Sequence, residues 1–145
     1  MYYPDLSVYR YEQDEADERL VNVGWLDGQH EYVRGGGPEG LPERLLLFCH
    51  RRVNRTRGLH YCEICPPEAA GPIRVQIGDE SVLLGSAEIR VFGEDGAVYA
   101  APDLIYHYVT EHRYLPPEAF IEAVLVSPLP GTAEYEALLD SVEAK

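Results

Sequence analysis

The sequence predicts a single α+β domain over residues 1–145, in which a small antiparallel β meander packs against C-terminal helices. Two patterns lead to this prediction. Short runs of strand-forming residues, separated by turns, occupy residues 73–101, and helical patterns occupy most of the chain after them. A chain of 145 residues has the usual length of one domain. Within it we assign the meander and the segment before it to residues 55–101, and the helical part to residues 102–143.

The first fifty residues predict a pair of strands and one helix. Tyr9 and Tyr11 stand at alternate positions, and so do the apolar residues of RLVNVGWLD, residues 19–27, which indicates strands. The acidic stretch EQDEADE between them is typical of a solvated loop. A helix then begins at Pro42, a residue that the first turn of a helix tolerates, and continues to Arg52.

Four runs predict the meander, namely IRVQI, SVLL, AEIRVF and AVYAA. The sequence EDG between the last two runs is typical of a hairpin turn. Three helical patterns follow: PDLIYHYVTEH from Pro102, PPEAFIEAVLV from Pro116 and TAEYEALLDSV from Thr132. The second of them places its apolar residues on one stripe and ends before Ser127 and Pro128. We expect these helices to pack against the meander.

Cys62 and Cys65 form a Cys-x-x-Cys motif within RTRGLHYCEICPPE. Two intervening residues let the chain turn back and point both thiolates at one metal ion, which supplies half of a tetrahedral zinc site. His107 and His112 are the best candidates for the other half, because four residues separate them on a predicted helix whose core-facing side they approach. The sequence therefore predicts a zinc knuckle and a structural, electrically neutral Cys2His2 site for Zn²⁺ that clamps the meander to the helix.

Other interpretations of the cysteines stay open. His60 is a reserve ligand, because His-x-Cys-x-x-Cys can supply three ligands from one hairpin. A site with three protein ligands and a water molecule would be hydrolytic instead of structural. A redox pair needs a helix that starts at the motif, whereas Pro66 and Pro67 follow it at once, and a pair that binds nothing is the last alternative. Cys49 lies in an apolar helical stripe and is interpreted as a core residue.

The charge of the chain limits its partners. A net charge of −13 opposes long-range attraction to nucleic acid or to an anionic membrane, and it suits either solubility or a basic protein partner. Four arginines, Arg51, Arg52, Arg55 and Arg57, gather before the cysteines and are candidates for binding an anion or a partner. The alternative is that they pair with the many carboxylates of the chain.

The cellular compartment follows from the cysteines and the apolar runs. Three cysteines do not make a disulfide framework, so we expect a reducing, cytoplasmic environment. The longest apolar runs are too short to span a bilayer, and no leader pattern precedes Tyr2. We therefore expect no association with a membrane.

Five strings of the sequence are distinctive together: YYPDLS, VGWLD, NRTRGLHYCEIC, GSAEIRV and YAAPDLIYHYVTEHRYLPPEAF. In these strings the chain resembles a family of small uncharacterised bacterial proteins that is common in high-GC actinobacteria. The resemblance covers most of the chain up to about Val124. The family has no established activity, so the resemblance implies a domain and carries no function with it. In size and acidity the chain is also similar to some immunity proteins that neutralise basic toxins.

The sequence contains no motif that indicates catalysis. There is no G-x-S-x-G and no glycine fingerprint for phosphate, and HYVTEH lacks the order of a helical metalloprotease motif. The leading hypothesis is a cytoplasmic zinc-binding module that acts by binding other molecules and is not an enzyme. The alternatives are an acidic immunity-type protein that neutralises a basic partner, and a metal-dependent hydrolase.

Overall fold

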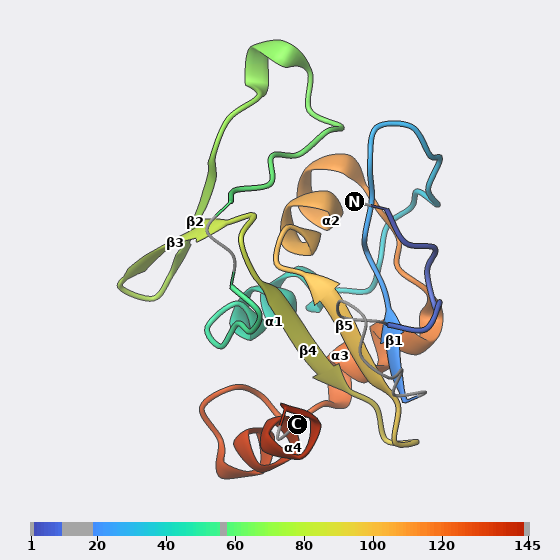
Figure 1. Ribbon diagram of the computed structural model, residues 1–145, viewed down its shortest axis with the longest axis vertical. Coiled ribbons are helices and arrows are strands. Elements are labelled where there is room, and N and C mark those ends of the chain that lie inside the picture. The colour runs from blue at the N-terminus through green and yellow to red at the C-terminus, as the bar shows by residue number, and fades with distance from the viewer. Residues whose placement is uncertain (1, 10–18, 56–57, 144–145) are drawn as a thin grey trace.

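The computed structural model describes residues 2–9, 19–55 and 58–143, and the fold of this part is α+β (Figure 1). It contains four α-helices: α1 (Leu41–Phe48), α2 (Ile105–His112), α3 (Glu118–Val126) and α4 (Ala133–Glu143). Its five strands are β1 (Leu20–Asn22), β2 (Ile73–Ile77), β3 (Glu80–Leu84), β4 (Glu88–Phe92) and β5 (Val98–Pro102). A single 3-10 turn, η1 (Pro67–Ala69), precedes β2 within these residues. None of the described helices is long and apolar enough to cross a membrane.

The predicted meander is divided between two sheets, so the prediction of one continuous antiparallel sheet was wrong. Strands β2 and β3 form a separate antiparallel hairpin, with Val75 opposite Val82. Strands β4 and β5 are antiparallel, and β1 joins β5 in parallel, which gives a mixed three-stranded sheet in the order β1-β5-β4. Leu20 lies opposite Val98 in the parallel pair, a long-range pairing that the alternation of residues 19–27 did not reveal.

Gly85 explains why the hairpin does not continue into β4. Its φ of +113° lies in a region that residues with a side chain rarely adopt. Its N–H donates to Oδ1 of Asp103 at 2.8 Å, and its carbonyl accepts the N–H of His60 at 2.7 Å. The chain is therefore bonded to other segments at the point where a meander would turn directly into its next strand.

The N-terminal segment runs beside β1. Val8 forms an isolated antiparallel bridge with Val21, and the N–H of Tyr9 donates to the carbonyl of Leu20 at 3.0 Å. These contacts agree with the predicted strand pair as far as Tyr9, whereas Tyr11 and the acidic stretch 12–18 lie outside the described residues. The second strand of the pair is shorter than predicted: β1 covers Leu20–Asn22, and one further backbone bond to β5 follows at Val23.

Helix α1 ends at Phe48, before the predicted end at Arg52. The N–H groups of Cys49 and His50 donate to the carbonyls three residues earlier, at 3.0 and 3.1 Å. Such bonds tighten the last turn and end the helix. Arg52 consequently lies beyond the helix, where the chain approaches the start of α2.

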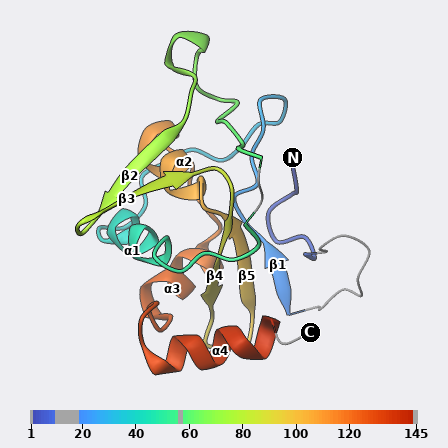
Figure 2. The ribbon, with the colours of Figure 1, turned by 60° about the vertical axis from the view of Figure 1, so that its left-hand side comes forward.

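The core lies between the three-stranded sheet and the helices α1 and α3, and α4 crosses near one end of the sheet (Figure 2). Tyr135 of α4 is fully buried, and its ring lies 5.9 Å from that of Phe48 and 5.3 Å from that of Phe92. Its hydroxyl donates to the carbonyl of Arg90 at 2.8 Å. Aromatic packing and this buried hydrogen bond thus attach the last helix to the sheet.

Replacing Gly85 by alanine should destabilise the domain by about 2–4 kcal/mol. An added Cβ would lie 2.3 Å from the carbonyl oxygen of His60, and the φ would be strained as well. Chemical denaturation measures the loss. Gly36→Ala is the matched control, because a Cβ there meets nothing within 4 Å, and it should change stability by less than about 1 kcal/mol. Equal stabilities of the two variants would contradict the account of Gly85.

Candidate metal site

The knuckle, defined as residues 62–65, presents two sulfur atoms from one turn. Cys62 is 5% exposed and Cys65 is half-buried. The backbone N–H groups of Ile64 and Cys65 hydrogen-bond to the sulfur of Cys62, which favours its thiolate form. Glu63 accepts the N–H of Gly28 at 3.0 Å, so the turn is also fastened to the loop that follows β1.

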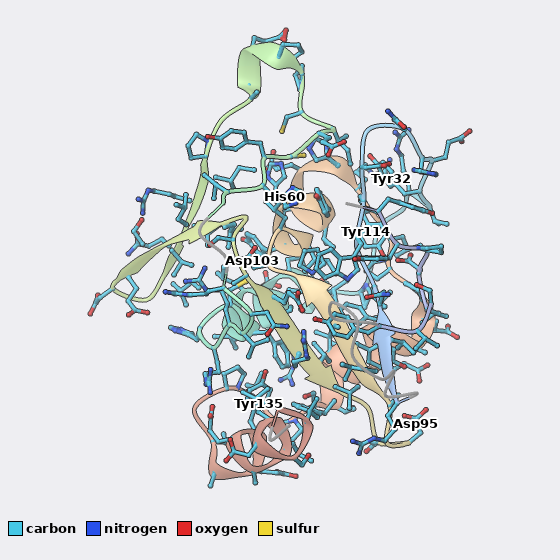
Figure 3. The ribbon with its side chains drawn as sticks, viewed as in Figure 1. Tyr32, His60, Asp95, Asp103, Tyr114 and Tyr135 are labelled. Atoms are coloured by element: carbon cyan, nitrogen blue, oxygen red, sulfur yellow. The ribbon has the colours of Figure 1, made fainter. Side chains whose placement is uncertain are left out.

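Helix α2 presents two imidazoles to the knuckle. His107 is 9% exposed and His112 is half-buried at the last residue of the helix. The helix stops there because Arg113 adopts a left-handed conformation, with φ of 55°. The hydroxyl of Tyr32 donates to the carbonyl of His112 at 3.1 Å. The end of the helix, and with it His112, is therefore held by a separate segment of the chain (Figure 3).

The sulfur and nitrogen atoms converge on one point. Sγ of Cys62 lies 3.3 Å from Nε2 of His112, and Sγ of Cys65 lies 3.3 Å from Nε2 of His107 and 3.4 Å from Nε2 of His112. All four ligand atoms lie within 4.8 Å of one another. Zinc bonds of about 2.3 Å to sulfur and about 2.0 Å to nitrogen place the corners of a tetrahedron about 3.3–3.8 Å apart. The observed separations are those of a group that could hold a metal ion.

Burial keeps the imidazoles in the form that binds metal. It lowers the pKa of His107 and of His112 below the ordinary value, against a smaller opposite effect of Glu111. Burial also raises the pKa of Cys62, and the backbone N–H groups of the turn only partly offset this. At neutral pH the histidines are therefore ready to bind, whereas a cation is needed to favour the thiolate of Cys62.

The four predicted ligands are thus brought together, and His60 is not among them. Its side chain is exposed and lines a cavity beside the knuckle, although its backbone N–H bonds to Gly85. The spacing of Cys62, Cys65 and the two histidines in the sequence was enough to predict that these residues lie close together. No local pattern pointed to Tyr32 or Glu63, which fasten the two halves of the group.

Two of the four arginines predicted to bind an anion or a partner are engaged within the chain. Arg51 lies 3.2 Å from a carboxylate oxygen of Glu136, and Arg52 lies 3.2 Å from Oδ2 of Asp103. Arg55 is exposed, and Arg57 lies outside the described residues. The contacts of Arg51 and Arg52 favour the alternative of pairing with carboxylates. Binding of an anion by the cluster stays a prediction.

Fold and site together define an α+β domain with a Cys2His2 cluster between a knuckle and a helix. Residues 1–125 match a family described as a domain of unknown function, DUF7919. The chain belongs to this family, which confirms the resemblance to an uncharacterised family; its bacterial source stays a prediction. The matched region contains all four residues of the cluster, whereas α4 lies beyond it. No match was found among curated proteins or among solved structures.

Cys49 should react with a thiol reagent far more slowly in the folded protein than after unfolding. It is 1% exposed, and burial raises its pKa to about 12, so its thiolate is scarce and inaccessible. Modification at pH 7.5, with peptide mapping by mass spectrometry, measures the rate at each cysteine. Cys65 in metal-free protein serves as the comparison, and a Cys49 rate as fast as that of Cys65 would contradict the core position.

Proposed function

We propose that this domain is a cytoplasmic binding module built around a structural zinc ion, held by Cys62, Cys65, His107 and His112. The convergence of two Sγ and two Nε2 atoms within 4.8 Å carries the proposal. These atoms come from segments more than forty residues apart, and chance packing rarely gathers four soft donors at one point.

The donor set favours zinc in a closed, structural site. Tetrahedral sets of two sulfur and two nitrogen atoms are typical of zinc, and four protein ligands leave no position for a reactive water molecule. Two thiolates and two neutral imidazoles balance the charge of Zn²⁺, so the ion can be partly buried at little electrostatic cost. A hydrolase would instead need an open coordination position.

The position of the cluster supports a role in binding. The knuckle leads into a loop that includes η1 and projects from the body of the domain before β2 (Figure 1). Most residues from 66 to 72 are exposed. A metal that joins the knuckle to α2 would fix the direction of this segment, which is a common use of structural zinc in interaction modules.

A basic protein is the partner class that the surface favours, as in the immunity-type alternative. Arg52 and Arg90 are used inside the domain against Asp103 and Glu88, so they offset little of the acidic surface. Binding to a basic protein should be fast and should weaken steeply with salt. A complex whose affinity is unchanged between low and high salt would argue against this class.

Purified protein should contain about one zinc ion per chain, and alanine or serine at any of the four ligands should abolish this. At free zinc a thousandfold above Kd, the ion should stabilise the fold by about 4 kcal/mol, which corresponds to roughly 10 °C in Tm. Plasma mass spectrometry and thermal unfolding with and without a chelator measure both effects.

Matched variants control for general damage to the fold. His60→Ala and Cys49→Ala should retain zinc, because neither residue belongs to the cluster. If His60→Ala lost zinc and His112→Ala retained it, His60 would be the ligand in place of His112. A chain that carries no zinc, and whose Tm a chelator leaves unchanged, would refute the proposed function.

The affinity for zinc should fall as the pH is lowered. Burial lowers the pKa of both histidines and raises that of Cys62, so protons compete chiefly for the thiolates. Between about pH 6.5 and 8.5, displacement of up to two thiol protons makes the affinity rise by up to about a hundredfold per pH unit. Competition with a chelator of known affinity at each pH measures the slope, and a flat profile would exclude thiolate ligands.

A further inference from the structure

A cavity of about 90 Å³ lies beside the knuckle, between the turn that joins β3 to β4 and the start of α2. Its walls come from four parts of the chain that are far apart in sequence. Six of the lining residues are aromatic or acidic: Trp25, Tyr61, Glu63, Glu88, Asp103 and Tyr108. Among the described lining residues there is no arginine and no lysine.

The negative charges of two of the three carboxylates are offset by arginines that do not line the cavity. Asp103 accepts hydrogen bonds from Arg52 at 3.2 Å and from the N–H of Gly85 at 2.8 Å. Glu88 is paired with Arg90 at 2.9 Å, and Arg90 is itself 3% exposed. These two ion pairs are close to neutral, so they shape the cavity without adding much net charge.

Glu63 is the carboxylate left with net charge. Its one hydrogen bond among the described contacts comes from the neutral N–H of Gly28. The cavity therefore combines one uncompensated negative charge with the rings of Trp25, Tyr61 and Tyr108. Aromatic faces and a carboxylate together are the chemistry that recognises an organic cation.

We propose that this cavity binds a guanidinium group, supplied either by a small free molecule or by an arginine side chain of a protein. A guanidinium is planar and weakly hydrated, stacks on aromatic rings and forms paired hydrogen bonds to a carboxylate. Its few non-hydrogen atoms suit a volume of about 90 Å³. The other lining residues are both polar, namely Asn54, His60 and Ser86, and apolar, and the apolar ones include Leu26, Pro102 and Leu104, which suit the aliphatic stem of an arginine.

The site also depends in part on the proposed zinc. Tyr61 and Glu63 flank Cys62, and Tyr108 lies next to His107 on α2, so the same two segments carry metal ligands and cavity walls. Zinc that joins these segments holds opposite walls at a fixed separation. Linkage then requires that the guanidinium raise the affinity for zinc by the same factor by which zinc raises that for guanidinium.

Titration of the full, zinc-loaded chain at pH 8 tests the proposal, with the fluorescence of Trp25 as the signal. Trp25 is the one tryptophan of the sequence and lines the cavity. Methylguanidinium and a blocked arginine amide should each give a saturable change, and neutral methylurea should not. Binding of methylguanidinium alone would indicate a small-molecule ligand, whereas tighter binding of the arginine amide would indicate a protein side chain. The same response to methylurea, or no saturable response, would overturn the site.

Substitutions distinguish binding in the cavity from the general attraction of a cation to an acidic protein. Glu63→Gln keeps an acceptor for the N–H of Gly28 but removes the charge, and it should weaken binding about tenfold. Tyr61→Ala removes an exposed ring and should weaken binding about two- to fivefold. Glu68→Gln, an exposed glutamate outside the cavity, should leave it unchanged. Equal weakening by Glu63→Gln and Glu68→Gln would overturn the proposal.

Zinc content and Tm, measured on each sample, keep this proposal distinct from the structural zinc. A chain that holds zinc but does not respond to guanidinium would refute the cavity site and leave the metal site standing. A chain without zinc that still binds guanidinium with the same affinity would refute the dependence on zinc. Weaker binding after chelation, restored by added zinc, is the expected result.

Discussion

The rest of the structure depends on the bonds that Gly85 and Arg52 make to the buried carboxylate of Asp103. Asp103 is 1% exposed, and burial raises its pKa even though Gly85 and Arg52 donate to it. A charge this deep is tolerated only with such donors, so three segments must meet there: the turn after β3, the chain after α1 and the start of α2 (Figure 3). This junction ends the hairpin and sets the first turn of α2, and therefore the direction in which its histidines point.

Helix α2 is also held at its C-terminal end, so contacts within the protein position the two imidazoles without the help of a metal ion. The hydroxyl of Tyr32 bonds to the last residue of the helix, and the hydroxyl of Tyr114 donates to Asp5 at 2.8 Å. Apart from the contacts of its sulfur atoms with the histidines of α2, the side-chain bond that joins the knuckle to the described body of the domain is the one between Glu63 and Gly28. A metal would thus join a well-fixed helix to a less constrained turn, and the turn gains most order from it.

The sequence revealed the cluster because its spacing is local: two residues separate Cys62 from Cys65, and one helix holds both histidines. The periodicity of apolar residues is also a local pattern, and it predicted the α+β class and most of the helices and strands. What the sequence did not show depends on distant partners. Polar Glu88 and Arg90 alternate with apolar residues in β4, a pattern typical of a solvated face, whereas in the structure Arg90 is buried and its guanidinium lies 4.9 Å from the centre of the Tyr9 ring. Nor does any local pattern encode the parallel pairing of β1 with β5, which brings segments nearly eighty residues apart together.

Three arginines of this acidic chain are engaged in contacts within it and add little positive charge to its surface. Arg44 donates to the carbonyls of Val124 and Ser127 at the end of α3, Arg52 pairs with the buried carboxylate of Asp103, and the buried Arg90 pairs with the partly exposed Glu88. Other described arginines, such as Arg55 and Arg113, are exposed, but the chain keeps an excess of negative charge, −13 in total. A Cys2His2 zinc would be neutral and would not reduce that excess. The exposed carboxylate of Glu63 beside the knuckle belongs to that excess, and the proposed binding of a cation depends on its charge.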